Sequence, residues 1–350
     1  MFFNIIWCLF PTLLLFDRKN NNFLSVLLLL FLIIVLGMRQ FDGVANDSEN
    51  YYTLFLYGID YLKTHYNHEP LFLYINILII SLNGSFQWVL LIFSVISLTS
   101  VYIACKVAKI NPFRGLIIYV LLTYYFYTFN CMRQMTADAV LMIGYTILTI
   151  NKYSKIRQII LYCLIVTFAA QIHKSAYAAL LIAPIHYYNI NLSYRTFCII
   201  GIGTLLVGAH PIAKQMVDTL SNIMGTYAVP EKYGYIYAVS PSKIAMTLFY
   251  MYLYKKSDNN NILLKTAILG LFLFNFMGFS VATMRSAYTF LVCQVLYLSN
   301  IKLHPSHVKE NDSISKLAIL YCIFIYYYFY SNNISDIQNY EMNPISFIIS

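Results

Sequence analysis

The sequence predicts an all-α protein, a polytopic transmembrane helical bundle of about twelve spans. The chain of 350 residues is 60% apolar and only 11% charged, whereas soluble proteins average about 25% charged residues. Many apolar runs approach or reach the roughly 17–25 residues that a helix needs to cross the hydrocarbon layer. Continuous helices satisfy their own backbone hydrogen bonds in lipid, whereas isolated sheets cannot.

We expect one membrane domain over residues 1–350, in which the apolar runs give the spans in order. The spans are expected near 2–16, 22–38, 86–105, 113–130, 132–150, 157–173, 175–190, 195–210, 242–254, 262–281, 283–299 and 316–331. The run 70–82 is too short to cross, so it is expected to be a re-entrant or interfacial helix. The run 2–16 lacks a basic start and a cleavage site, which favours an uncleaved first span over a signal peptide.

The distribution of charge predicts which loops lie outside the cell. Alternating the spans places 15 of the 23 Lys and Arg residues on one face and eight on the other, while four of the 14 acids fall on the first face and ten on the second. The positive-inside bias makes the first face cytoplasmic. The acidic loop 39–85, with its short helix, and the loop 211–241 are therefore expected to be extracytoplasmic. The same bias accounts for the net charge of +9 without a nucleic-acid partner, so the expected surroundings are a lipid bilayer.

No cofactor or metal is expected. The seven cysteines are scattered and form no Cys-x-x-Cys pair, which argues against a disulfide framework or a metal knuckle. The chain has no phosphate-binding P-loop, dinucleotide-binding glycine turn or zinc helix motif. The energy for any reaction should therefore come from the substrate itself.

Four cations lie at the predicted outer ends of spans. Arg39, Arg133 and Arg285 each follow a methionine, and Lys174 joins two predicted spans on the same face. An ionisable residue at the membrane edge needs a partner, and guanidinium groups bind phosphate oxygens bidentately. We therefore expect these cations to bind a phosphorylated ligand, and on the outer leaflet a lipid-linked phosphate or diphosphate is the natural one.

Each of these residues also has a structural explanation. Arg133 could extend to lipid headgroups, or it could pair with Asp138, which lies deeper in the same span on the face of Gln134. Arg285 could mark a simple interfacial turn. His173 lies at a predicted helix end, where a lone histidine is more often structural than catalytic.

The segment from Gly37 to Pro70 supplies the carboxylates that the cationic site lacks. Asp47, Glu49 and Glu69 are candidates to accept a proton from a sugar hydroxyl, and His173 is a further candidate. The tyrosines of this region could stack on sugars or belong to the interfacial aromatic belt. These tyrosines are Tyr51, Tyr52, Tyr57, Tyr61, Tyr66 and Tyr74.

The order of these residues resembles that of the EpsG-like exopolysaccharide polymerases, which are related in role to Wzy-type O-antigen polymerases. The matching positions are Arg39; Gly43, Asp47 and Tyr51; Glu69 and Pro70; Arg133, Gln134 and Ala137; His173, Ser175 and Ala176; Arg285 and Tyr288; and Tyr340 and Pro344 in the tail. Two extra residues separate Gly43 from Asp47, which leaves Asp42 and Glu49 as alternatives to Asp47. Gln171 replaces the aromatic residue that is usual two positions before the histidine.

The resemblance implies transfer of polyprenyl-diphosphate-linked oligosaccharide repeat units outside the cytoplasmic membrane of a bacterium. Arg133 and Arg285, helped by Arg39 or Lys174, would hold the donor diphosphate. A base from among Asp47, Glu49, Glu69 and His173 would orient or deprotonate the acceptor sugar hydroxyl. The supporting residues would be Tyr51, Gln134, Asp138, Ser175 and Tyr288. A chain-length regulator protein is a partner that such an enzyme could have.

Two other functions fit the same residues. A polyprenyl-phosphate-dependent glycosyltransferase that adds a single sugar would use similar outer carboxylates. A translocator of lipid-linked oligosaccharides would not be an enzyme, and it would need charged residues along a path to the cytoplasmic side.

Overall fold

The computed structural model describes residues 11–13, 22–39, 46–66, 69–223, 237, 239–258, 260–279, 281–301 and 310–332. These residues are helical and contain no β-strand, so the predicted all-α class is confirmed. The helices are α2 (Asn22–Gly37), α3 (Asn46–Leu56), α4 (Ile59–Tyr66), α5 (Pro70–Ser81), α6 (Phe86–Val107), α7 (Pro112–Leu121), α8 (Tyr124–Asn130), α9 (Met132–Ile147), α10 (Lys155–Ala170), the 3₁₀ helix η2 (Lys174–Leu181), α11 (Ile182–Tyr187), α12 (Tyr194–Gly208), α13 (Ile212–Ile223), α14 (Pro241–Lys256), α15 (Ile262–Met277), α16 (Val281–Leu291), α17 (Cys293–Ser299) and α18 (Asn311–Asn332).

Local sequence determines where many of these helices start. Pro70, Pro112 and Pro241 are the first residues of their helices, a position where the missing N–H costs nothing. Ser154 and Ser193 precede α10 and α12, and each side chain accepts a hydrogen bond from a backbone N–H of the first turn, as N-cap residues do.

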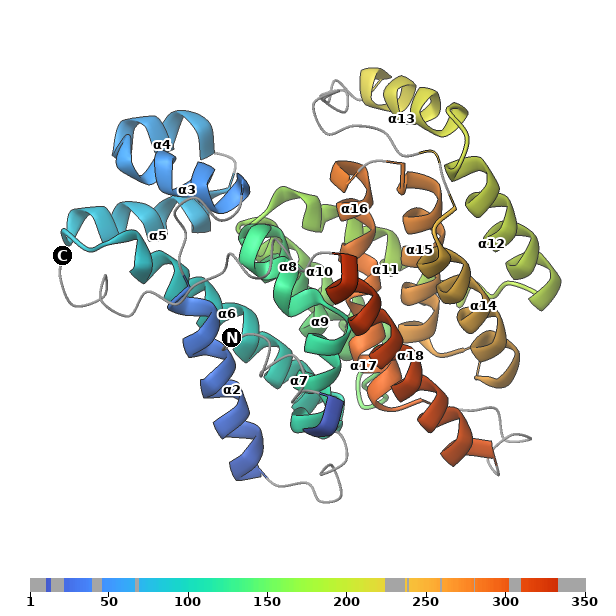
Figure 1. The fold of residues 1–350 in the computed structure, drawn as a ribbon. Helices are drawn as coiled ribbons and strands as arrows, with labels where there is room; N and C mark the ends of the chain where they lie inside the picture. The colour runs from blue at the N-terminus through green and yellow to red at the C-terminus, as the bar shows by residue number, and fades with distance from the viewer. Residues whose placement is uncertain are drawn as a thin grey trace.

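Helix α9 forms the centre of the bundle. It packs against α6, α10 and α16, with α2 on one side of the molecule and α12 and α13 on the other (Figure 1). Almost every side chain between Met132 and Thr146 is buried. Arg133, at the start of this helix, is therefore held by a fixed scaffold.

Several predicted spans are interrupted. The run 113–130 is divided into α7 and α8 at Thr123, whose φ of 70° is left-handed, and the run 175–190 is divided into η2 and α11. The run 283–299 is divided only by a turn at Val292, whose backbone angles are still helical. The outer loops are also more helical than expected, because 39–85 contains α3, α4 and α5, and 211–241 contains α13.

The length of the described helices supports only part of the predicted membrane topology. Helix α6 is long and apolar enough to cross a bilayer alone, and α12 with residues 212–219 qualifies only as one span bent by 93°. The arrangement of twelve spans stays a prediction, and the run 2–16 lies outside the described residues except for 11–13.

The outward faces of several helices are apolar. On α10, Ile156, Ile160, Leu164 and Phe168 follow one another at four-residue intervals, and each side chain is more than half exposed. A water-facing helix would carry polar residues on this face, and a soluble monomer rarely exposes a large apolar patch. These faces are suited to contact with lipid.

Two glycines of α12 provide a matched test of its packing. A Cβ at Gly208 would overlap the backbone carbonyl of Asn275 on α15, whereas a Cβ at Gly203 would meet nothing within 4 Å. We expect Gly208→Ala to lower the thermal unfolding temperature in detergent, because the two helices must separate to admit the methyl group. Gly203→Ala should leave that temperature unchanged or raise it, since alanine favours a helix. Equal unfolding temperatures for the two variants would contradict the close packing of α12 on α15.

Candidate functional site

The candidate site forms where three segments of the chain meet. Glu69 directly precedes α5, Arg133 lies in the first turn of α9, and His173 follows α10. The backbone fixes two of these segments together, because the N–H of Leu71 donates to the carbonyl of Gln171 at 2.9 Å. Glu69 and His173 are therefore held side by side by the main chain as well as by their side chains.

Glu69 is the centre of the first cluster. Its Oε2 accepts from the Arg133 guanidinium, and its Oε1 lies 2.7 Å from Nδ1 of His173 and 3.3 Å from the backbone nitrogen of Lys174. Only 1% of the carboxylate side chain is exposed. Burial alone would raise the pKa of Glu69, but the bonds to His173 and Arg133 outweigh it and lower the pKa from 4.5 to about 2. Glu69 is thus ionised at any physiological pH.

Aromatic rings surround the Arg133 guanidinium. Its central carbon lies 4.8 Å from the ring centroid of Tyr51, 4.5 Å from that of Tyr66 and 5.0 Å from that of Phe72. Rings at this distance attract a cation and shield it from water. The side chain of Arg133 remains 14% exposed. Burial raises the pKa of Tyr51 to about 12, so this ring is neutral beside the cation.

A second ion pair lies next to the first. Arg285, in α16, donates to Asp47 Oδ2 at 2.7 Å, and the backbone N–H of Asp47 donates to Asn130 Oδ1 at 3.2 Å. The side chain of Gln134 donates to the carbonyl of Arg285 at 2.6 Å. Gln134 adjoins Arg133 in α9, so the two ion pairs are joined through one helical turn. Arg285 and Asp47 are 24% and 19% exposed, more than the Arg133–Glu69 pair.

The structure thus brings together residues that the alternation of spans assigns to one outer face. Glu69 contacts Arg133 and His173, and Asp47 contacts Arg285, so two groups of direct contacts join five separate parts of the chain. The alternative in which Arg133 pairs with Asp138 is wrong, because the guanidinium pairs with Glu69. Both carboxylate oxygens of Asp138 are buried without a hydrogen bond among the described residues.

Other predicted site residues lie elsewhere. Arg39 is only 1% exposed, donates to the carbonyl of Leu36 at 2.6 Å and lies 5.4 Å from the ring centroid of Phe129. A guanidinium buried in this way is not presented to a diphosphate, so the structure does not support that role for Arg39. Glu49 is exposed on α3 and makes no ion pair among the described residues.

The remaining predicted residues differ in their exposure and in their distance from the two ion pairs. The side chain of Lys174 is exposed, and only its backbone contacts Glu69. The Oγ of Ser175 is buried without a hydrogen bond in the described part of the chain. Tyr288 is buried among aromatic rings, with that of Tyr127 at 4.8 Å, so it supports the core and does not face the two ion pairs. Residues 41–45, which include Asp42 and Gly43, and residues 333–350, which include Tyr340 and Pro344, lie outside the described residues.

Three residues that contact the candidate site residues were not predicted from the sequence. Asn130 anchors Asp47, Phe72 faces Arg133, and Gln87 donates to the carbonyl of Arg39 at 3.3 Å. Asn130 could have been predicted from the sequence, because it is the polar residue that ends the apolar run before Arg133. Phe72 and Gln87 lie in apolar helices and carry no comparable signal.

Glu69 and His173 are suited to different chemical roles. A carboxylate with a pKa of about 2 is a weak base, so Glu69 is suited to orienting His173 and Arg133. His173 is bound through Nδ1, which leaves Nε2 able to accept a proton, and its side chain is 22% exposed. A carboxylate that holds the other imidazole nitrogen is a recurrent way to position a general base. Within the described residues, no group of three or more His, Cys, Asp or Glu side chains is placed to hold a metal ion.

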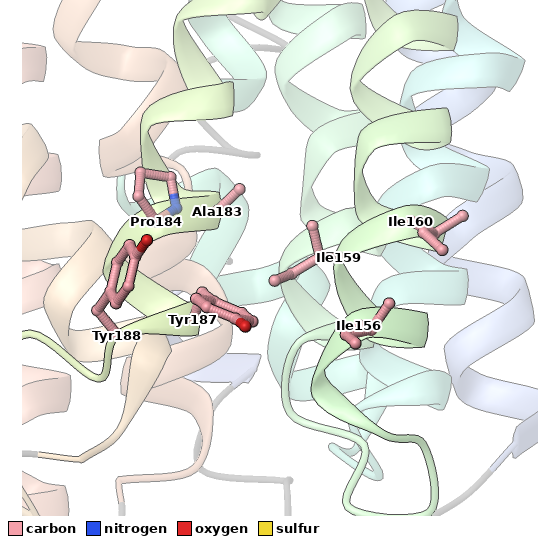
Figure 2. Close-up of a pocket in the computed structure, with 7 residues that line it drawn as sticks. All are labelled: Ile156, Ile159, Ile160, Ala183, Pro184, Tyr187 and Tyr188. Carbon is pink, nitrogen blue, oxygen red and sulfur yellow. The ribbon is translucent and has the colours of Figure 1, made fainter.

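An apolar depression of about 350 Å³ lies at the far end of α10. It is lined by Ile156, Ile159, Ile160, Ala183, Pro184, Tyr187 and Tyr188 (Figure 2). The lining residues of α10 belong to its first turns, whereas His173 follows its last turn, roughly 20 Å away at 1.5 Å per residue. This depression is therefore separate from the charged cluster.

The comparison with known families identifies the family of the chain. The model of the EpsG family matches residues 22–347, nearly the whole chain. The chain belongs to the EpsG family. This is a family of membrane proteins and Wzy-like polymerases, as the order of the motif residues predicts. No curated protein and no solved structure shows significant similarity to the chain.

Proposed function

We propose that this EpsG-family protein is a polysaccharide polymerase, a membrane glycosyltransferase that joins polyprenyl-diphosphate-linked repeat units at the extracytoplasmic face. The observation that carries the proposal is the convergence of two arginine–carboxylate pairs and His173 at one end of the bundle. Such a site offers cations for a leaving diphosphate beside a group that can accept a hydroxyl proton. The proposal places the chain in the cytoplasmic membrane of a bacterium with about twelve spans.

In the proposed reaction, the acceptor sugar hydroxyl attacks the anomeric carbon of the donor unit. A new glycosidic C–O bond forms, and the bond between the anomeric carbon and the diphosphate oxygen breaks. His173 Nε2 receives the hydroxyl proton, and Glu69 stabilises the resulting imidazolium through Nδ1. The lipid diphosphate leaves with the electron pair, and its charge is stabilised by Arg285 and Arg133.

The two arginines would share the diphosphate unequally. Arg285 is the more exposed of the two, and it binds the Asp47 carboxylate through one guanidinium nitrogen. Its other N–H groups are therefore available to bind phosphate oxygens. Arg133 is enclosed by aromatic rings and bound to Glu69, so its positive charge would stabilise the diphosphate without direct contact. Fixed charges in a water-poor site stabilise a developing anion more than mobile ones do.

Replacing Arg133 by Ala is expected to abolish polymer while single repeat units still reach the cell surface. Loss of this cation removes charge stabilisation of the leaving group, an effect of about 10²–10³-fold for one such group. Surface glycans from cells expressing Arg133→Ala would be separated by length, with the protein level measured in the membrane fraction. Arg195→Ala, an exposed arginine at the start of α12, is the control and should give full-length polymer.

The products of this experiment distinguish the three functions. Full-length polymer from Arg133→Ala at normal protein level would contradict the proposal. Surface units shorter by one sugar would indicate a single-sugar transferase instead. Accumulation of complete units on the inner leaflet would indicate a translocator.

A further inference from the structure

The structure divides the tyrosines of the outer segment into groups with different surroundings. Tyr51 and Tyr66 face Arg133, and Tyr52 packs on Phe86 at 5.8 Å. Tyr57 and Tyr61 are instead 63% and 40% exposed. Together with Tyr74, these two are the tyrosines of the set with exposed side chains.

Tyr57, Tyr61 and His65 form a continuous ladder of rings. The centroids of Tyr57 and Tyr61 are 4.8 Å apart, and those of Tyr61 and His65 are 4.0 Å apart and stacked. Tyr61 and His65 are four residues apart on α4, so their rings lie on one side of that helix, and Tyr57 lies in the turn that precedes α4. The His65 ring is fixed by a contact of 2.9 Å between its Nδ1 and the carbonyl of Tyr61, which leaves Nε2 outward.

Polar groups lie beside this ladder. Asp60, Lys63 and Thr64 are exposed on the same short helix, while Leu62 is fully buried on its inner side. The Asp60 carboxylate makes no ion pair or hydrogen bond among the described residues. The outward face of α10, in contrast, carries Ile156, Ile160, Leu164 and Phe168 in succession. The outer face of α4 therefore meets water and not the hydrocarbon layer.

The chemistry of this face fits a sugar ring. Sugars have one apolar C–H face, which packs on an aromatic ring, and a rim of hydroxyl groups, which bond to carboxylate, hydroxyl and imidazole groups. The same helix also reaches the candidate site, because Tyr66, at its end, lies 4.5 Å from the Arg133 guanidinium. In Figure 1, α3, α4 and α5 gather at one corner of the molecule.

We propose that Tyr57, Tyr61 and His65, with Asp60 beside them, form a subsite that holds sugar residues of the growing polysaccharide. The inference rests on the proposed function, since it names where the saccharide chain of that reaction is held. Tyr74 is also exposed, but it lies on the apolar helix α5 and makes no ring contact among the described residues. It has the position of an interfacial belt residue and serves as the control.

The test is binding of saccharide without transfer. Lipid-free fragments of the cell's own surface polysaccharide, released by mild acid, would be titrated into the full-length protein in lipid nanodiscs and followed by saturation-transfer NMR. We expect Tyr57→Ala combined with Tyr61→Ala to weaken binding about tenfold or more, and Tyr61→Phe to keep most of it. Tyr74→Ala and Arg285→Ala should bind as the wild type does.

The same variants in cells provide a second readout. The double variant should shorten the polymer without removing it, because the ladder holds the chain and takes no part in bond exchange. Unchanged fragment binding or unchanged polymer length in the double variant would overturn the subsite. If fragment binding depends on the ladder while Arg285→Ala cells still make polymer, the subsite stands and the proposed reaction site falls.

Discussion

Replacing Glu69 by Gln is expected to remove polymer synthesis almost completely. The variant leaves Arg133 enclosed by rings without a counter-charge and leaves His173 without the carboxylate that fixes Nδ1. Removing one partner of a buried ion pair costs about 3–5 kcal/mol, and loss of an oriented base typically costs about 10²–10⁴-fold in rate. Glycan length and protein level would be measured as for Arg133→Ala. Glu49→Gln, at an exposed acid of the same segment, should behave as the wild type.

The pH dependence of stability isolates the contribution of Glu69. Its pKa is lowered in the folded state from 4.5 to about 2, so its contribution is complete above pH 4.5 and is lost as the pH falls toward 2. The difference in thermal unfolding temperature between wild type and Glu69→Gln should therefore persist from pH 7 to about pH 5 and shrink below pH 4.5. A difference that disappears between pH 7 and pH 5 would contradict the ion pair as described.

Replacing Arg285 by Ala is expected to reduce polymer formation by about 10²–10³-fold, as removal of a group that stabilises a leaving anion does. Arg285→Lys should recover only part of the activity, because an ammonium group lacks the planar fork that grips two phosphate oxygens. Asp47→Asn should have a smaller effect, since Asp47 contacts the guanidinium and not the departing group. Synthesis would be measured as the rate at which radiolabelled repeat units enter polymer in isolated membranes.

The control for the Arg285 variants is a substitution far from the candidate site. Arg157 lies at the start of α10, 4.5 Å from the ring centroid of Tyr153, and Arg157→Ala should leave the rate unchanged. A rate that falls with Asp47→Asn but survives Arg285→Ala would reverse the roles of the two residues. It would make the carboxylate the reactive group and the arginine its support.

The sequence could predict the fold class and most members of the site. Low charge and long apolar runs are sufficient for an all-helical chain, and the alternation of spans places Glu69, Arg133 and His173 on one side. The sequence could not predict which of these side chains bind one another. Glu69 and Arg133 are 64 positions apart, and Glu69 and His173 are 104 positions apart, so only tertiary packing determines that both bind one carboxylate.

Burial accounts for the residues that the sequence misplaced. Arg39 and Arg133 have the same flanking residues, but Arg39 is buried beneath the ring of Phe129 and Arg133 faces the acidic segment. Helical spacing places Asp138 on the face of Gln134, one turn below Arg133, yet the Arg133 guanidinium binds Glu69. Rotamer choices of this kind depend on neighbouring helices, which a single sequence does not reveal.

In the proposed reaction, the two arginine–carboxylate pairs and His173 join diphosphate-linked units. The most direct test is a reaction in which the purified protein in nanodiscs is given only the lipid-diphosphate-linked repeat unit, without a nucleotide sugar or a metal ion. We expect wild-type protein to lengthen the saccharide and to release one polyprenyl diphosphate per added unit, and Arg285→Ala to do neither. A wild-type protein that leaves the units single, or an Arg285→Ala variant that joins them at the wild-type rate, would contradict the proposed reaction.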